Sequence, residues 1–276
     1  MLSKLSKILI VLLLASSFSC QKEDFTINNL FEGKIVVLGH GGMGIGQTYP
    51  MDSYESIMKC ISIGANGSEI DVQLSKDNIL VAYHNQDLSD KTNLKGLVNN
   101  LNWKEIKKGY YTSTPYLNYS ILSLDDLFSN IKNLHKYKFT FDCKLYKDKN
   151  PSFQDNYVDA IEKIIAKYNL YENVYIESQS LQFLKKLQNK NKLFKLFIYP
   201  SSFEKGLEIA INNNLYGITI STEIITKEQI EIAHKNNIYV AVWNTHSRNK
   251  NIEAIKKNPD FIQTDRVQHL VNMEVQ

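Results

Sequence analysis

Short runs rich in β-branched and aromatic residues alternate along this chain with longer stretches whose apolar residues recur at helical spacing. Ile161, Ile164 and Ile165 show that spacing, and Ser123 and Thr226 precede acidic first turns as N-cap residues do. The runs predict strands at Lys34–His40, Ser68–Val72, Leu80–His84, Phe139–Cys143, Val174–Glu177, Leu196–Tyr199, Gly217–Ile220, Tyr239–Trp243 and Phe261–Gln263. The stretches predict helices at Tyr54–Ile63, Leu124–Leu134, Asn156–Tyr168, Leu181–Gln188, Phe203–Asn212, Lys227–Lys235 and Asn249–Lys256.

This alternation indicates parallel strands joined by crossover helices. The number of units favours an α/β fold of the TIM type, a closed (β/α)8 barrel, over an open doubly wound sheet. The pattern contains one strand too many for that barrel, so one of them is expected to be an extra or hairpin strand. Residues 86–121 have no strand–helix unit of their own and predict a small insertion after an early strand, on the barrel rim.

Composition narrows the class of protein. The chain has 276 residues, of which 43% are hydrophobic and 22% charged, which excludes a disordered or collagen-like chain. The formal net charge is +3, so there is no concentrated positive charge that would indicate nucleic-acid binding. With no linker or internal repeat, residues 33–276 are expected to form one domain.

The N-terminus reads as an export signal. Lys4 and Lys7 precede the apolar run Ile8–Ala15, which is too short to span a bilayer, and residues 1–19 are predicted to be a signal peptide. Cys20 follows Ser17-Phe18-Ser19 as the lipidated cysteine follows a bacterial lipobox. We therefore expect residues 20–32 to be a lipidated tether that anchors an exported lipoprotein to a membrane, periplasmic or at the cell surface. The alternative is an ordinary signal peptide with a chance cysteine.

The two remaining cysteines lie in apolar elements. Cys60 falls in a predicted helix and Cys143 in a predicted strand, where small thiols commonly fill a core. No disulfide is expected, although an exported chain could form one.

Ionisable residues fall at unusual places in two strands. Glu69 and Asp71 are two residues apart, so a strand directs both to one face, and Asp142 and Lys144 repeat the pattern in another strand. Three inward carboxylates repel one another, and burial raises their pKa values. A divalent cation removes both difficulties, and oxygen ligands suit either Mg²⁺ or Ca²⁺.

Two histidines complete the candidate site. His40 and His84 each end a predicted strand, and in a parallel barrel the active site lies at the C-terminal ends of the strands. Imidazoles beside a cation suit a general acid and a general base. The glycines between Gly41 and Gly46 do not precede a helix and so do not form a phosphate loop. The other histidines are expected at the surface: His135, His234, His246 and His269.

These residues resemble the glycerophosphodiester phosphodiesterase family, a group of metal-dependent TIM barrels. Its opening His-Arg-Gly and Pro-Glu-Asn-Thr motifs correspond to His40-Gly41-Gly42 and Pro50-Met51-Asp52-Ser53. Its Glu-x-Asp block corresponds to the segment from Gly64 to Asn78. Further parallels, covering Lys34 to Gln268, are His84-Asn85, Ile121–Leu127, Asp142-Cys143-Lys144, Val242-Trp243-Asn244 and Gln263-Thr264-Asp265.

The resemblance implies hydrolysis of glycerophosphodiesters to glycerol 3-phosphate and an alcohol. It implies that Glu69, Asp71 and Asp142 bind the cation and that His40 and His84 form the acid–base pair. Lys144 would be a cationic partner of the phosphate, and Trp243 would help to form the alcohol pocket.

Three departures separate the chain from the family pattern. Gly41 stands where the family has an arginine, Asn85 replaces an aspartate, and Asp142 is one methylene shorter than the usual glutamate. These departures leave open a non-catalytic member that binds glycans or phosphodiester polymers. A second alternative, which membrane tethering through Cys20 would suit, is a phospholipase-like barrel that cleaves lipid head groups. The latter would carry a hydrophobic loop at the barrel mouth.

Overall fold

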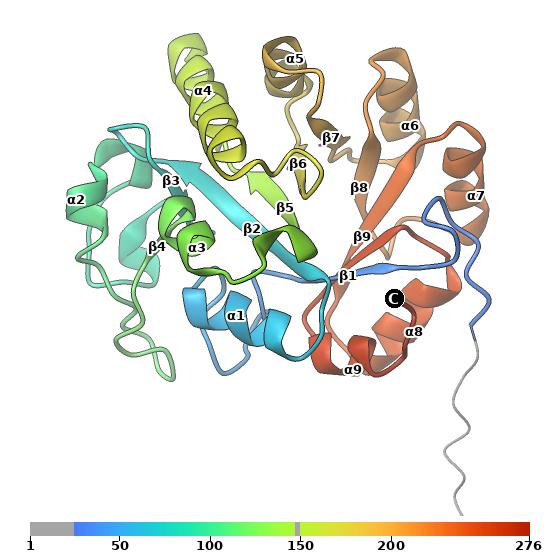
Figure 1. Cartoon of the computed structure of the whole chain (residues 1–276), viewed down its shortest axis with the longest axis horizontal. Coiled ribbons are helices and arrows are strands. Elements are labelled where there is room, and N and C mark those ends of the chain that lie inside the picture. The colour runs from blue at the N-terminus through green and yellow to red at the C-terminus, as the bar shows by residue number, and fades with distance from the viewer. Residues whose placement is uncertain (1–24, 147–149) are drawn as a thin grey trace, which may run out of the picture.

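The computed structural model describes residues 25–146 and 150–276 and shows a closed barrel of parallel strands with helices outside it (Figure 1). The barrel strands are β1 (Val36–Gly39), β2 (Gly67–Leu74), β5 (Lys138–Cys143), β6 (Val174–Ser178), β7 (Lys195–Ile198), β8 (Gly217–Ser221), β9 (Tyr239–Thr245) and β10 (Phe261–Thr264). The larger helices are α1 (Tyr54–Ser62), α3 (Leu124–Asn130), α4 (Pro151–Tyr168), α5 (Leu181–Lys190), α6 (Phe203–Asn212), α7 (Lys227–Lys235) and α8 (Arg248–Lys256), and α9 (Val267–Val271) is a short closing helix.

Closure comes from β1, which pairs in parallel with both β2 and β10. The predicted (β/α)8 barrel is therefore confirmed. The additional strand is β3 (Leu80–Ala82), which pairs antiparallel to the end of β2, as expected for a hairpin strand. A two-residue strand that the sequence pattern did not predict, β4 (Leu122–Ser123), pairs antiparallel to β3.

The helices begin where the capping residues indicate. The hydroxyls of Ser123 and Thr226 accept hydrogen bonds from the backbone N–H groups of Asp126 and Gln229, which fixes the first turns of α3 and α7. Helix α4 begins five residues before the predicted start, because Pro151 occupies its first turn and Asn150 caps it.

Strand alternation separates two apolar cores. Ile70 and Val72 of β2, with Phe139 and Phe141 of β5, face outward into the core beneath the helices. A smaller core fills the barrel itself, from residues near the N-terminal ends of the strands: Val36, Leu38, Tyr175, Phe197, Ala241 and Phe261. The inward positions that remain, at the C-terminal ends, carry polar side chains.

Residues 86–121 run from β3 to β4 at one side of the barrel (Figure 1). They contain two 3-10 turns, Leu88–Asp90 and Val98–Asn100, and the one-turn helix α2 (Trp103–Ile106). Their apolar residues pack with Val81 and Tyr83 into a separate small cluster. A third 3-10 turn, Leu134–Lys136, precedes β5.

Cys60 and Cys143 are buried free thiols within the described residues. The predicted signal peptide, Cys20 and the first part of the tether lie outside the described residues. Among the helices of the described residues, none is both long and apolar enough to cross a bilayer.

Candidate active site

Four carboxylates line the inner wall of three adjacent strands at the C-terminal end of the barrel. Glu69 and Asp71 lie on β2, Asp142 lies opposite Asp71 on β5, and Glu177 lies opposite Asp142 on β6. Glu69, Asp71 and Glu177 are almost fully buried, whereas the side chain of Asp142 is 15% exposed. The strand phase predicted from the sequence thus places three of these acids on one wall, and the structure adds Glu177.

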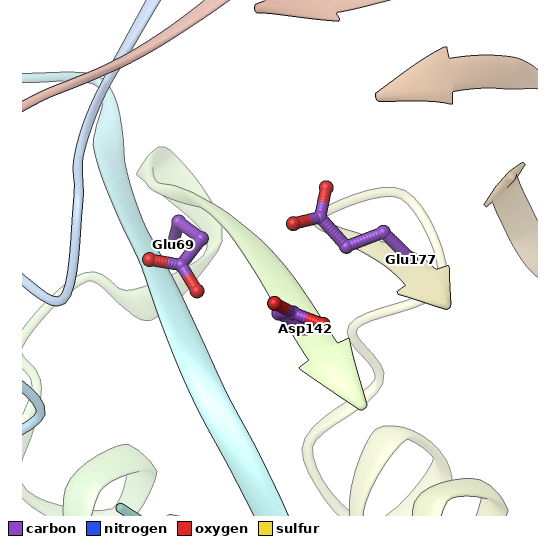
Figure 2. Close-up of side chains that lie close together, drawn as sticks. All are labelled: Glu69, Asp142 and Glu177. Atoms are coloured by element: carbon purple, nitrogen blue, oxygen red, sulfur yellow. The ribbon is translucent and has the colours of Figure 1, made fainter. Parts of the chain in front are cut away.

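Glu69, Asp142 and Glu177 point toward one another (Figure 2). One oxygen of each lies within 4.8 Å of the others. Burial raises the pKa of Glu69 well above its ordinary value, and the negative charges of Asp71 and Asp142 add to the effect. Burial also raises the pKa of Asp142 against the opposing charge of Lys144. This group of acids is electrostatically strained unless a cation offsets it.

Asp71 lies beside that group, but its contacts differ and its pKa is shifted in the opposite direction. Its Oδ1 forms an ion pair with Nζ of Lys144 at 2.8 Å, and Lys144 also bonds Asp142. Burial alone would raise the pKa of Asp71, but Lys144 and the two histidines outweigh it and lower the pKa. Its Oδ2 is buried and has no hydrogen-bond partner among the described residues. Asp71 is therefore a charged, buried carboxylate, and Asp52, whose pKa is raised in part by a side-chain interaction with Asp71, lies next to it.

Glu177 was not predicted from the sequence as a site residue. Its Oε2 accepts hydrogen bonds from Oγ1 of Thr219 at 2.6 Å and from Nε2 of Gln263 at 3.1 Å. Burial and the charge of Asp142 raise its pKa to about 8. The available signal was its position as the last residue of a predicted strand, in phase with the inward Tyr175.

His40 follows β1 and is oriented by Asp265, which follows β10. Nδ1 of His40 lies 2.9 Å from Oδ1 of Asp265, whose second oxygen bonds His246. Burial lowers the pKa of His40, but the hydrogen bond to Asp265 and the charges of Asp265 and Asp71 outweigh it, so the pKa is raised. His246, expected to be a plain surface residue, is half exposed and belongs to this network.

The other three histidines that were expected at the surface also differ in their exposure and contacts. His234 bonds the fully buried Asp260 at 2.9 Å and is only 11% exposed, and His269 bonds Asn251. Only His135 is simply exposed among them. Carboxylate or amide partners distant in sequence explain the difference, because helical position alone does not reveal them.

His84 follows β3 and is exposed, with Nδ1 2.9 Å from Oδ1 of Asn85. His40 and His84 line one cavity of about 380 Å³ at the mouth of the barrel. The antiparallel hairpin thus returns His84 to the end of the barrel that holds His40, although β3 is not a barrel strand.

Asp52, within the Pro50-Met51-Asp52-Ser53 segment, also reaches the site. It is buried with a φ of +63°, and its Oδ1 accepts a hydrogen bond from the backbone N–H of Asp71 at 3.0 Å. Burial raises its pKa well above the ordinary value, and the charges of Asp71 and Glu69 raise it further. This contact fixes the backbone of β2 between its two acids.

Trp243 lies on the inward face of β9 and packs edge-on against Tyr199 with ring centroids 5.6 Å apart. Its indole Nε1 is buried without a hydrogen-bond partner among the described residues. An unpaired buried donor is costly, which marks this wall as a place where a polar group of a ligand would be stabilised.

Comparison with known proteins identifies the family of the chain. Residues 43–269 match the model of the Glycerophosphoryl diester phosphodiesterase family. The chain belongs to this family. A glycerophosphodiester phosphodiesterase of Caldanaerobacter subterraneus subsp. tengcongensis is 26% identical to it over 87% of this chain and 98% of that protein.

Solved structures share the family fold. A phosphodiesterase of Oleispira antarctica, in complex with its product sn-glycerol-3-phosphate, has a TM-score of 0.78 and 16% identity, covering 89% of this chain and 99% of that one. A glycerophosphodiester phosphodiesterase of Parabacteroides distasonis has a TM-score of 0.73 and 18% identity, covering 88% and 99%.

The structure also shows which residue occupies the space beside Gly41, the position at which the family motif has an arginine. Gly41 has a φ of +54°, and a Cβ placed on it would lie 2.8 Å from Cβ and Cε of Met51. Met51 thus occupies the space in which a side chain at position 41 would begin.

Proposed function

We propose that this chain hydrolyses glycerophosphodiesters to glycerol 3-phosphate and an alcohol, using a divalent cation and a histidine pair. Family membership supports the reaction class. The observation that carries the proposal is that the cluster of Glu69, Asp142 and Glu177 and the two histidines lie at the same end of the barrel. Such a constellation suits attack on phosphorus with departure of an alkoxide.

Glu69, Asp71 and Asp142 are the proposed cation ligands. Glu69 and Asp142 face each other with raised pKa values, and Asp71 offers a charged, buried oxygen without a partner. Glu177 lies near enough to add a further oxygen, but two hydrogen-bond donors already satisfy its Oε2. The donor set is all oxygen, which fits Mg²⁺ or Ca²⁺. When bound, the cation would offset the charge that develops on the phosphate oxygens.

His40 and His84 are the proposed acid–base pair. The carboxylate of Asp265 accepts the Nδ1 proton of His40, so Nε2 is the nitrogen that exchanges a proton with the substrate. One imidazole accepts the proton of the attacking oxygen, and the other donates a proton to the leaving alkoxide.

Lys144 and Trp243 are the proposed substrate-side residues. Lys144 forms ion pairs with Asp71 and Asp142 and so offsets part of their negative charge. Its ammonium group also lies beside the proposed position of the anionic phosphate. Trp243 contributes an indole N–H and an aromatic wall for the alcohol portion.

The test is release of glycerol 3-phosphate from glycerophosphocholine by the purified full-length protein. We expect release with Mg²⁺ or Ca²⁺, none after EDTA treatment, and recovery when the cation is restored. A folded, cation-loaded protein that releases no product would overturn the proposed reaction.

We further propose that the protein is a lipoprotein held at a membrane through Cys20. The support is the position of Cys20 after a short apolar run that follows two lysines. Metabolic labelling with a radioactive fatty acid in a bacterial host tests it. Label in the wild-type protein and none in Cys20→Ser is expected; equal labelling of both would contradict it.

A further inference from the structure

The end of the barrel opposite the active site carries an excess of lysines, which the small net charge of the chain does not reveal. The connections that precede the barrel strands lie at this N-terminal end, because the strands are parallel. Exposed lysines stand in or beside four of these connections, and none forms an ion pair with a described residue: Lys34, Lys132, Lys136, Lys192 and Lys235. We call these five lysines the basic face.

Few exposed acids oppose the basic face. Those in the same connections, and in the C-terminal segment that bonds the start of β1, are Glu32, Glu172 and Glu274. Of these, Glu172 pairs with Lys195 at 2.6 Å. The carboxylates of the active site lie at the other end of the barrel. Positive charge thus gathers at one end of the molecule and negative charge at the other.

Two further lysines lie at the centre of this end. The ammonium groups of Lys138 and Lys195 lie 5.7 Å and 5.3 Å from the centroid of the Tyr175 ring. Burial lowers the pKa of Lys138, and the charge of Lys195 lowers it further. The lysines of this end are therefore close enough to repel one another, which an anionic surface would relieve.

Half-buried aromatic rings and one exposed leucine accompany these lysines. Tyr216 precedes β8 and Tyr239 begins β9, and their rings stack with centroids 4.3 Å apart. Phe31 packs on Tyr239 at 4.9 Å. The side chain of Leu193, in the connection before β7, is 59% exposed. Lysines among tyrosines and an exposed apolar side chain are typical of surfaces that lie in the head-group region of a bilayer.

The N-terminal segment of the chain is fixed to the same end. The backbone N–H of Leu30 donates to Oδ1 of Asp260 at 2.9 Å, and Asn29 donates to a backbone carbonyl of the connection before β10. Phe25 is the first described residue and packs against the core. It lies five positions after Cys20, and five residues span at most about 18 Å. An acyl group on Cys20 would therefore hold this end of the barrel near the bilayer.

We propose that the basic face binds the anionic head groups of a membrane. The N-terminal end of the barrel then lies on the bilayer, and the mouth of the active site is directed away from it. A lysine close to an anionic bilayer favours binding about fivefold, and a lipid anchor and a basic surface reinforce each other. The inference goes beyond the proposed reaction, and it does not require Cys20 to be acylated.

The test is co-sedimentation of the full-length Cys20→Ser protein, which cannot be acylated at position 20, with vesicles in EDTA. One set of vesicles is phosphatidylcholine, and the other is phosphatidylcholine and phosphatidylglycerol in equal parts. The apolar run Ile8–Ala15 is common to every variant and meets both kinds of vesicle. We expect binding to the anionic vesicles to be at least about 30-fold tighter and to weaken as salt is added. Equal binding to both kinds would overturn the inference.

Two double variants separate the basic face from net charge. Lys136→Gln/Lys192→Gln removes two charges of the face and should weaken binding to the anionic vesicles at least about tenfold. The matched control is Lys205→Gln/Lys227→Gln, which removes two exposed lysines from the first turns of α6 and α7, at the opposite end of the barrel. It should weaken binding less than about twofold, because those lysines are more than a Debye length from the bilayer. Equal losses in the two variants would contradict the inference.

A tryptophan placed at either end tests the orientation. Leu193→Trp and Ile45→Trp replace side chains that are 59% and 53% exposed, the first at the N-terminal end and the second at the active-site cavity. Phosphatidylglycerol with brominated acyl chains should quench the added fluorescence of Leu193→Trp and not that of Ile45→Trp. Equal quenching at both positions, or quenching of Ile45→Trp alone, would overturn the inference.

Two further outcomes are distinct. Binding to dextran sulfate with none to the anionic vesicles would assign the basic face to a soluble acidic polymer and overturn the inference. Release of glycerol 3-phosphate is measured separately and should be unchanged in both double variants, since neither alters the site. Its failure in every form of the protein would overturn the proposed function and leave the vesicle result standing.

Discussion

The buried carboxylate of Asp265 lies 2.9 Å from Nδ1 of His40, although 225 positions separate the two residues in the chain. Barrel closure creates this contact, because β1 and β10 are neighbours and both residues follow the ends of these strands. The contact fixes the imidazole by its Nδ1 and raises its pKa against the effect of burial.

Asp265→Asn should lower the pKa of His40 and reduce turnover by about 10²-fold or more, because the amide no longer stabilises the imidazolium. In the wild type, the raised pKa of His40 adds to the free energy of unfolding below pH about 6.5. This contribution is lost as the pH rises through the native pKa of His40. NMR titration of the His40 ring, beside a pH profile of kcat/KM, checks both effects. An unchanged His40 titration in the variant would remove Asp265 from the account.

Replacing His84 by alanine should cut turnover by about 10²–10⁴-fold if it exchanges a proton with substrate. His135→Ala is the matched control, since His135 is also exposed but lies before β5, at the other end of the barrel. Steady-state kinetics of both variants measures the difference. Near-wild-type turnover of His84→Ala would exclude it from the reaction.

In EDTA, the free energy of unfolding should fall as the pH rises from about 5 to 8. Burial and the charge of Asp142 raise the native pKa of Glu177 to about 8, whereas an unfolded glutamate titrates near pH 4.3. The native state therefore binds more protons across that interval, and stability decreases with pH. Urea unfolding at several pH values measures the slope.

Glu177→Gln should flatten that slope, because its side chain does not ionise. The exposed Glu208 provides the control, and Glu208→Gln should leave the slope as in the wild type. A wild-type stability that rises steadily over the interval would contradict the electrostatic account of the carboxylate group.

Gly41→Ala should destabilise the fold more than Gly46→Ala. Both glycines have positive φ, +54° and +70°, so each substitution incurs about 1 kcal/mol of left-handed strain. Only at Gly41 does the new Cβ also meet Met51, at 2.8 Å, which adds roughly 1–3 kcal/mol. Equal unfolding midpoints for the two variants would show that Met51 moves aside without strain.

The sequence predicted the barrel well because strand alternation and helix periodicity are local signals. The inward phase of Glu69, Asp71 and Asp142 followed from the two-residue period of a strand. The contacts of His246 and Glu177 were not foreseeable in that way, since each depends on a partner from another strand or its end: Asp265, after the neighbouring β10, for His246, and Thr219 and Gln263 for Glu177. Contacts between strands decide these pairs, and periodicity along one strand does not encode them.

Calorimetric titration of Mg²⁺ or Ca²⁺ into the EDTA-treated, desalted protein tests the central claim most directly. We predict one cation site in the wild type, binding weakened at least about 100-fold in Asp71→Asn, since a charged ligand is lost, and a smaller loss in Glu177→Gln. Wild-type protein that binds no divalent cation, or binding that survives Asp71→Asn unchanged, would contradict the account.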